Sequence, residues 1–288
     1  MTRWADMRGL GRWLGSDRTV PPGTVRQDVL DFTCNVCGFR NRANPAAIQR
    51  ETPVCPWCGS NLRERTLIQA LSRHWFADDL PLPRFPVQNN VRGIGMSDRA
   101  GLARRLAKRC GYRNTFYHRK PRLDILRIPD EWIQSLDFLI SSEVLEHVVP
   151  PVGAAFVNLR RLLKPGGLLL LSVPWVPEGE TTEHFPELFD YAVDDAAPNG
   201  PVLRNRTRAG RRQEFHPLVF HGGPGKTLEM RVFSKTGLQR ELENAGFVDI
   251  RILGGEHLPF GICWHQPWSM PIAARAPSGC RAAPRPQA

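Results

Sequence analysis

The chain has 288 residues, of which 41% are hydrophobic, and a formal net charge of +11. This length suits one large domain and one small one, at about 100–200 residues per domain. No run of the sequence approaches the ~20 apolar residues of a membrane helix, and residues 1–23 lack the apolar core of a secretory signal. We therefore expect a cytoplasmic protein without a membrane span, whose oligomeric state the sequence leaves open.

Positive charge is concentrated between residues 81 and 130, where twelve Lys and Arg face three Asp and Glu. Such a stretch can attract nucleic acid, anionic lipid or a phosphorylated substrate. It can equally form a solvated helix face, because charge alone is weak evidence for a partner. The charge pattern therefore leaves both interpretations open.

Four cysteines in two pairs follow a leader that we expect over residues 1–26. The pairs are Cys34 with Cys37 and Cys55 with Cys58, separated by 17 residues. This spacing is typical of zinc sites, in which four thiolates complete a closed tetrahedral shell around a structural Zn²⁺. Unrelated buried cysteines, two disulfides or a redox pair are the alternatives.

The residues around the cysteines support a zinc ribbon, predicted with its following helix over residues 27–80. Gly38 and Gly59 each follow a pair, where a tight turn requires a residue free of Cβ strain. About 30 residues cannot bury enough apolar surface to fold alone, and zinc can contribute about 10–16 kcal/mol in small sites. The apolar spacing over residues 62–76 predicts the helix.

Beyond a proline-rich linker, residues 87–273 alternate between strand and helix patterns and form the second predicted domain. We expect strands at 91–95, 114–117, 136–140, 168–173 and 247–253, and helices at 99–108, 143–148, 154–163 and 236–245. The alternation predicts an α/β fold: a Rossmann-like, doubly wound and mostly parallel sheet with helices on both faces. Ligands of such sheets bind at the carboxyl ends of the strands.

Two segments depart from this alternation. Residues 174–235 are polar and rich in Pro, Gly and His, and so long an insertion after a central strand is often a lid or substrate loop. Residues 274–288 are rich in Ala, Pro and Arg and predict a disordered tail.

Three stretches, at 141–148, 161–168 and 231–247, together resemble a class I S-adenosyl-L-methionine (SAM)-dependent methyltransferase of the type 11/12-like kind. The sequences Ser-Ser-Glu-Val-Leu-Glu-His-Val and Arg-Leu-Leu-Lys-Pro-Gly-Gly-Leu carry most of the resemblance, which covers residues 87–253. A zinc ribbon ahead of such a domain is similar to a bacterial subset of the family. The resemblance implies a seven-stranded sheet, SAM as cofactor and transferase activity.

The family's first glycine motif is only partly present. The resemblance places Gly95 at its first glycine and implies that Gly93 and Gly95 approach the cofactor, while Ser97 and Arg99 stand where further glycines are usual. Asp98 is a candidate for binding the ammonium or ribose of SAM. Its alternative role is a helix N-cap.

The other cofactor residues implied by the resemblance follow later strands. Residues 117–120 lack the acid that usually holds the ribose. Asp124 matches the acid that contacts adenine, with a turn residue as the alternative. Ser142 and Glu143 end the fourth strand of the family's order, where cofactor and acceptor would meet.

The acceptor side is less defined. Glu143, Glu146 and His147 share one helical turn, which in some related O-methyltransferases binds a divalent cation; the alternative is a structural turn with a hydrogen-bonded, metal-free histidine. His184 is a candidate base, as is His216 or His221, because histidine titrates near neutral pH. The predicted catalytic residues are His184, Glu143 and His147.

These observations predict SAM-dependent methyl transfer to a small-molecule or sugar-containing acceptor, such as a glycan precursor. Alignment of acceptor and sulfonium supplies much of the rate in such reactions, so few catalytic side chains are needed. An RNA methyltransferase or nucleic-acid binder is the alternative, as is a non-catalytic protein with the same scaffold.

Overall fold

The computed structural model describes residues 20–26, 28–221 and 227–279, which form two compact units. The N-terminal unit contains the described residues up to Phe85 together with Gly254–His265. The sheet unit contains the described residues from Pro86 to Leu253 and those from Gln266 onward. Most of the predicted leader and the end of the predicted tail lie outside the described residues.

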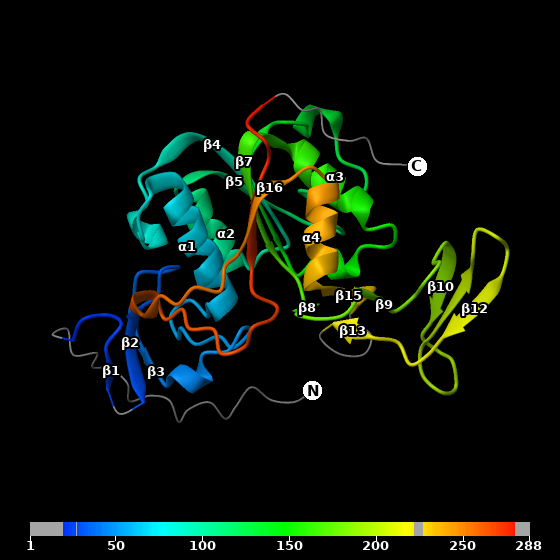
Figure 1. Ribbon diagram of the computed structural model, residues 1–288, viewed down its shortest axis with the longest axis horizontal. Coiled ribbons are helices and arrows are strands. Elements are labelled where there is room, and N and C mark those ends of the chain that lie inside the picture. The colour runs from blue at the N-terminus through cyan, green and yellow to red at the C-terminus, as the bar shows by residue number, and fades with distance from the viewer. Residues whose placement is uncertain (1–19, 27, 222–226, 280–288) are drawn as a thin grey trace. The chain divides into compact units, whose positions relative to one another are not determined.

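The N-terminal unit combines a small antiparallel sheet with one long helix (Figure 1). Its elements are β1 (Val25–Arg26), β2 (Val29–Thr33), β3 (Arg40–Ala43), α1 (Leu62–Phe76) and the 3₁₀ turns Pro45–Ala47, Leu82–Arg84 and Leu258–Phe260. Helix α1 begins where the Asn61 side chain accepts a hydrogen bond from the Glu64 amide, and it ends at Ala77, which has a left-handed φ of 51°. Its bounds are those predicted from the apolar spacing.

The stretch Gly254–His265 packs with the N-terminal unit, which interrupts the domain predicted over 87–273. The Arg65 guanidinium donates to the Gly261 carbonyl at 3.0 Å. A Cβ at Gly261 would come within 3.0 Å of the Phe32 ring, so the backbone of this stretch lies directly on a buried aromatic side chain. The sequence carries no periodic pattern there that could have indicated this contact.

The sheet unit is built on six described strands in the order β16-β17-β7-β6-β4-β5. They are β4 (Gln88–Met96), β5 (Cys110–Thr115), β6 (Leu136–Ser142), β7 (Leu163–Ser172), β16 (Val248–Ile252) and β17 (Ile272–Arg275). Strands β4 to β7 are parallel, and β17 runs antiparallel to both β7 and β16. The predicted seventh strand is not present among the described residues.

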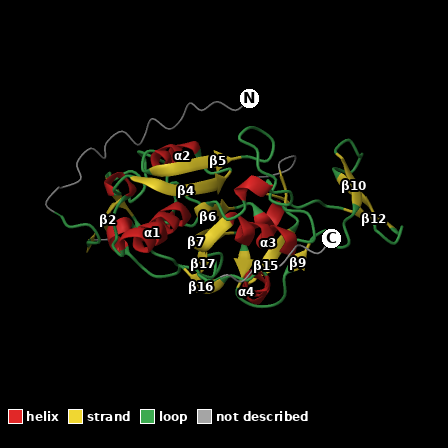
Figure 2. Cartoon of the chain, turned by 90° about the horizontal axis from the view of Figure 1, so that it is seen from above, coloured by secondary structure: helices red, strands yellow, loops and turns green. Residues whose placement is uncertain are grey.

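Helices cover both faces of this sheet, as predicted. They are α2 (Ala100–Ala107), α3 (Gly153–Leu162) and α4 (Lys235–Asn244), with 3₁₀ turns at Asp130–Trp132 and Leu145–His147. Helix α2 lies on one face, and α3 and α4 lie on the other (Figures 1 and 2). The helix predicted over 143–148 is wrong, because Glu143 has a φ of 57° and only the short turn Leu145–His147 forms.

The predicted disordered tail is also wrong at its start. Strand β17 fills the gap between β7 and β16, with Ala274 opposite Leu169. Ile272 and Ala274 are buried while Ala273 is half-buried, which is the alternation of a strand with one face in the core. The high Ala content of this segment therefore reflects close packing in the sheet.

The core of the sheet unit follows from apolar strands buried on both sides. Residues 168–171 of β7 are four consecutive leucines, all buried, as expected for a central parallel strand. Phe156 of α3 and Phe233 pack edge to face at 6.1 Å between ring centroids. Within the described residues, no helix has the length and apolar character needed to span a bilayer.

The insertion over residues 174–235 contains short strands and not only loops. They are β8 (Trp175–Val176), β9 (Thr182–Glu183), β10 (Asp190–Asp194), β11 (Val202–Arg206), β12 (Arg212–Phe215), β13 (Phe220–His221), β14 (Thr227–Leu228) and β15 (Arg231–Ser234). Strands β10 to β12 form an antiparallel meander, and Phe185, Leu188, Leu203 and Met230 form a small core. The insertion is therefore a built substructure attached to the sheet unit.

Candidate functional site

A cavity of about 400 Å³ opens at the carboxyl ends of β4, β5 and β6. This is the point where the strand order reverses, since β5 lies on one side of β4 and β6 on the other. The lining comes from residues 96–97 after β4, 115–118 after β5, 123–126, 143–144 and 147–149 after β6, and Tyr191, Thr227 and Met230 of the insertion. Its volume lies in the range of about 300–1,000 Å³ that is usual for small-ligand sites.

Three of the predicted site residues of the sheet unit line this cavity: Asp124, Glu143 and His147. The other five do not line it: Gly93, Gly95, Asp98, Ser142 and His184. The cavity thus brings together Glu143 and His147, which follow β6, and Asp124, which precedes it, whereas the predicted glycines do not line it.

Gly93 and Gly95 are required by packing. A Cβ at Gly93 would come within 3.0 Å of three ring carbons of Phe138, and one at Gly95 would do the same to the Asp98 carboxylate and the Tyr112 hydroxyl. Both glycines therefore allow side chains of neighbouring segments to cross β4. The predicted role of approaching a cofactor directly remains a prediction.

Asp98 holds the turn after β4 together. The Tyr112 hydroxyl donates to its carboxylate, its amide donates to Asn114 Oδ1 at 3.0 Å, and its carbonyl accepts from Asn114 Nδ2 at 2.7 Å. Burial and the adjacent carboxylate raise the pKa of Tyr112, so its hydroxyl stays protonated as a donor. Asp98 is not the N-cap of α2, because that position belongs to Arg99.

Ser97 has a φ of 64° at the cavity rim, a conformation that favours glycine. We expect Ser97→Gly to raise the free energy of unfolding by about 0.5–1 kcal/mol, because it removes Cβ strain. Chemical denaturation measures this change. Ser97→Ala is the control, since alanine keeps the Cβ and gains nothing; equal stability of the two variants would contradict the prediction.

Asp124 and Glu143 present carboxylates to the cavity from turns. Asp124 Oδ1 accepts a hydrogen bond from the Leu126 amide at 3.0 Å, as a turn-forming aspartate does. Its Oδ2 takes no part in that bond. Glu143 Oε1 accepts from Ser172 Oγ at 3.1 Å. Ser142 Oγ lies 2.9 Å from the same hydroxyl, so it supports Glu143 from behind the lining.

His147 lies beside Glu146 and His221, and not in a cluster with Glu143. The ligand atoms of these three residues lie within 4.8 Å of one another. His184 has other partners: its Nε2 lies 3.1 Å from Glu229 Oε1, and its amide donates to the Met230 carbonyl. His184 therefore does not line the cavity that Glu143 and His147 line.

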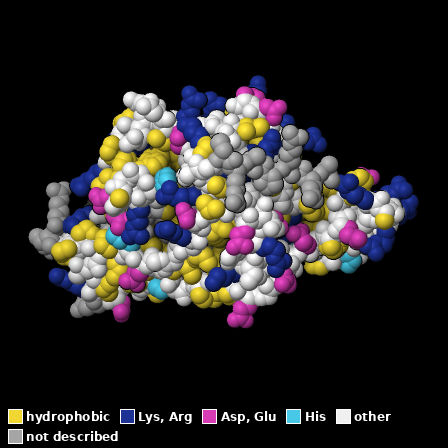
Figure 3. Space-filling view, turned by 45° about the horizontal axis from the view of Figure 1, so that its top comes forward, with side chains coloured by type: hydrophobic (Ala, Val, Ile, Leu, Met, Phe, Trp, Pro, Cys, Tyr) yellow, Lys and Arg dark blue, Asp and Glu magenta, His cyan; other side chains and the backbone are white. Residues whose placement is uncertain are grey.

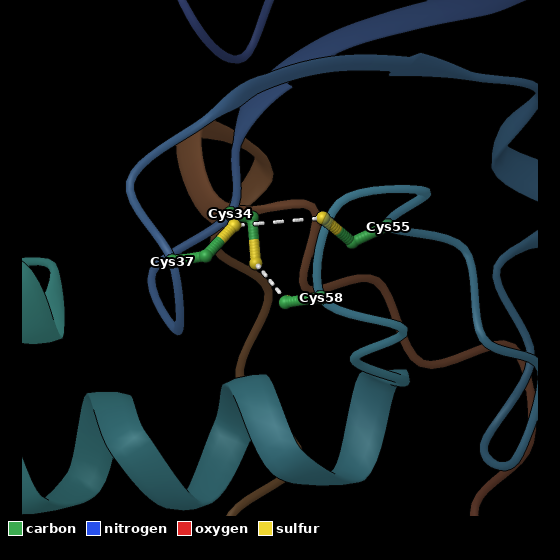
Figure 4. A group of neighbouring side chains, drawn as sticks. All are labelled: Cys34, Cys37, Cys55 and Cys58. Atoms are coloured by element: carbon green, nitrogen blue, oxygen red, sulfur yellow. Dashed lines mark hydrogen bonds between the residues drawn. The ribbon is translucent and has the colours of Figure 1, made fainter. Parts of the chain in front are cut away.

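The four paired cysteines converge in the N-terminal unit (Figure 4). Cys34 Sγ lies 3.6 Å from Cys58 Sγ, and Cys37 Sγ lies 3.6 Å from Cys55 Sγ. A tetrahedral zinc with Zn–S bonds of about 2.3 Å places its sulfurs about 3.8 Å apart. The donor set and its spacing therefore fit a zinc ion.

Two identical turns present these thiols. The Gly38 amide donates to the Cys34 carbonyl and the Gly59 amide to the Cys55 carbonyl, both at 2.7 Å. Both glycines have positive φ, 82° and 67°, as expected from their places after the pairs. The repeated geometry explains why the cysteines occur in pairs with two residues between them.

Arg65 supplies the positive charge that such a centre needs. A zinc with four thiolates carries a net charge of −2, and Arg65, fully buried, interacts electrostatically with Cys34 and Cys55. Its guanidinium donates to the Ser60 and Gly261 carbonyls and lies 5.2 Å from the Phe32 ring centroid. The environment therefore suits an anionic metal centre and a structural role.

Sequence reasoning missed much of the cavity lining. Thr115 and Phe116 line it although the sequence indicated no role for them, and the same is true of Tyr191, Thr227 and Met230. The insertion pattern was the one available signal, because it indicated a segment that shapes a substrate site. No local pattern marks which of its side chains reach the cavity.

The sheet unit is an α/β domain with a cavity at its switch point, which is the position where such sheets commonly bind ligands. Residues 86–171 match the family model described as a methyltransferase domain. This part of the sheet unit is therefore similar to a methyltransferase domain, in agreement with the sequence motifs. No curated protein matches the chain significantly.

Several solved structures are similar to this chain at low identity. The 1,6-didemethyltoxoflavin-N1-methyltransferase of Burkholderia thailandensis is 15% identical, over 75% of this chain and 78% of its own, with a TM-score of 0.39. CalS10 of Micromonospora echinaspora, an amino pentose methyltransferase, is 14% identical over 76% and 92%, with a TM-score of 0.43. The CurJ carbon methyltransferase is 13% identical over 76% and 56%, with a TM-score of 0.40.

Proposed function

We propose that the chain transfers the methyl group of SAM to a small-molecule or sugar-containing acceptor bound in the cavity of the sheet unit. The observation that carries this proposal is the cavity of about 400 Å³, which lies at the switch point of a sheet whose sequence matches a methyltransferase domain. Zinc holds the N-terminal unit folded and takes no part in the chemistry, because four thiolates leave it no open position.

The lining divides the cavity by chemistry. Met96, Thr115 and Asp124 lie near the ends of the central strands, where the nucleoside of SAM would bind. Tyr191 and Met230 come from the insertion and would contact the acceptor. Glu143 and His147 lie after β6, where the two ligands would meet.

Methyl transfer places a modest demand on this site. SAM supplies an activated methyl on its sulfonium, and the acceptor attacks in line with the breaking C–S bond, so positioning lowers most of the barrier. A polar group near the acceptor then handles the proton that the acceptor loses. The cavity and the acidic residues Asp124 and Glu143 in its lining suit such positioning.

Calorimetry with S-adenosylhomocysteine tests the proposal directly. We expect saturable binding of one equivalent per chain, followed by turnover of methyl-labelled SAM with cell extract. An absence of heat with both SAM and S-adenosylhomocysteine would remove the proposal. Binding without turnover would instead favour the non-catalytic alternative.

Asp124 offers a test that separates binding from turn formation. We expect Asp124→Asn to weaken S-adenosylhomocysteine about tenfold, because the amide replaces the oxygen acceptor facing the cavity and still accepts from the Leu126 amide. Calorimetry measures the change, and thermal denaturation confirms that the turn is intact. Unchanged affinity would leave Asp124 with its turn role alone.

A nucleic-acid acceptor is less well supported. On the face drawn in Figure 3, Lys and Arg side chains are interspersed with Asp and Glu. Among the arginines near the zinc site, Arg42 pairs with Asp31, and Arg50 and Arg63 pair with Glu51. A salt titration with single-stranded RNA tests this alternative, because phosphate contacts lose affinity steeply with salt.

A further inference from the structure

Three potential metal ligands converge beside the cavity from two distant segments. Glu146 and His147 belong to the turn after β6, and His221 belongs to β13 in the insertion. Glu146 Oε1 lies 3.7 Å from His147 Nε2 and 3.6 Å from His221 Nδ1. The ligand atoms of all three residues lie within 4.8 Å of one another. The two distances from Glu146 are too long for hydrogen bonds, so hydrogen bonding does not account for this cluster.

The hydrogen bond at Nδ1 sets the tautomer of the His147 ring. His147 Nδ1 lies 2.8 Å from the Leu228 carbonyl, which can only accept, so Nδ1 carries the proton. The Nε2 of His147 therefore turns a lone pair toward the fully buried carboxylate of Glu146.

Two electron-rich atoms that face each other at this distance repel. A cation between them replaces the repulsion with coordination. His221 Nδ1 adds a third donor, since it is buried and forms no hydrogen bond within the described part of the chain. Ligands about 2.1 Å from a common metal lie roughly 3.0–3.4 Å apart, so the two distances from Glu146 need to close by only a few tenths of an ångström.

We propose that Glu146, His147 and His221 bind a divalent transition cation such as Mn²⁺, separate from the cysteine site. Two imidazoles and one carboxylate are a ligand set that Mn²⁺, Fe²⁺ and Zn²⁺ accept, while Mg²⁺ favours oxygen ligands. The hydrogen bond from His147 to Leu228 orients the ring as partners of metal ligands commonly do. Because His147 lines the cavity, the open coordination positions face the place of the acceptor.

The surrounding structure holds the ligands in place. Arg231, fully buried, donates to the carbonyls of Leu145 and Val148 on either side of the Glu146–His147 pair. The Met230 amide donates to the Glu146 carbonyl at 2.7 Å. Arg231 Nε lies 2.6 Å from Glu183 Oε1, so its buried charge is paired with a carboxylate.

The role of this ion rests on the proposed function. The cation binds an acceptor hydroxyl and lowers its pKa, so the proton leaves to solvent. The oxygen then forms a bond to the methyl carbon of SAM, and the electron pair of the breaking C–S bond passes to sulfur. The products are the methyl ether and S-adenosylhomocysteine.

Manganese binding to the zinc-loaded full chain tests the site, with calorimetry and electron paramagnetic resonance as readouts. Mn²⁺ is the probe because it disfavours thiolates and leaves the cysteine site undisturbed. We expect one Mn²⁺ per chain, and at least tenfold weaker binding in His221→Ala and in Glu146→Gln. His216→Ala, at an exposed histidine near the end of the same insertion, is the matched control and retains wild-type binding.

Each outcome decides the proposal. No Mn²⁺ binding by the wild-type chain, or wild-type binding by His221→Ala, overturns it, with unchanged zinc content and circular dichroism as the check that the variant is folded. S-adenosylhomocysteine binding without Mn²⁺ binding removes this ion alone. Mn²⁺ binding without S-adenosylhomocysteine binding keeps the ion and removes the proposed function.

Discussion

Purified chain should contain about one zinc atom, and Cys34→Ser should lose it and unfold the N-terminal unit. The four thiols lie at the spacing of a tetrahedral zinc centre, and zinc contributes about 10–16 kcal/mol to folding in small sites. That contribution is comparable to the whole stability of an ordinary domain, about 5–15 kcal/mol. Elemental analysis measures the zinc, and limited proteolysis within residues 28–85 measures the unfolding.

Cys110→Ser is the matched control for this experiment. Cys110 is a buried thiol in β5 of the sheet unit, and burial raises its pKa to about 12, so it stays protonated and binds no metal at neutral pH. We expect its zinc content to equal that of the unchanged chain. A folded wild-type chain without zinc would contradict the assignment of the cysteines.

The sequence predicted the periodic parts of the fold well, because their signals are local. The bounds of α1 followed from its apolar spacing, and the parallel strands β6 and β7 followed from buried apolar runs. The turns Gly38 and Gly59 followed from the need for positive φ after each cysteine pair. Each of these features depends on residues close together in the chain.

The sequence-based predictions were wrong where segments that are distant in the chain pair with each other. Strand β17 has an alanine-rich sequence without a strong strand pattern, and its place between β7 and β16 supplies the missing stabilisation. The candidate cation site shows the same limitation. Sequence spacing grouped Glu143 with Glu146 and His147, whereas folding of the insertion brings His221 to them and leaves Glu143 bonded to Ser172.

The glycines predicted to approach the cofactor lead to the second large effect: Gly93→Ala should destabilise the sheet unit by about 1–3 kcal/mol. An added Cβ would overlap the ring of Phe138, which is fully buried in the neighbouring strand β6 and stacks on Tyr112 at 5.8 Å. Chemical denaturation measures the loss. Gly101→Ala in α2 is the control, because a Cβ there meets only ordinary contacts and favours the helix.

A double-mutant cycle decides whether this glycine serves packing or binding. Phe138→Leu removes the ring carbons that the new Cβ would meet. The double variant Gly93→Ala with Phe138→Leu should therefore lose less free energy of unfolding than the two single variants lose together, by a coupling energy of about 1 kcal/mol. Strict additivity would show that the overlap is not the cause. Near-normal S-adenosylhomocysteine affinity in the double variant would then show that Gly93 is required for packing and not for binding. A cofactor in contact with the Gly93 backbone would lose affinity whether or not the ring is present.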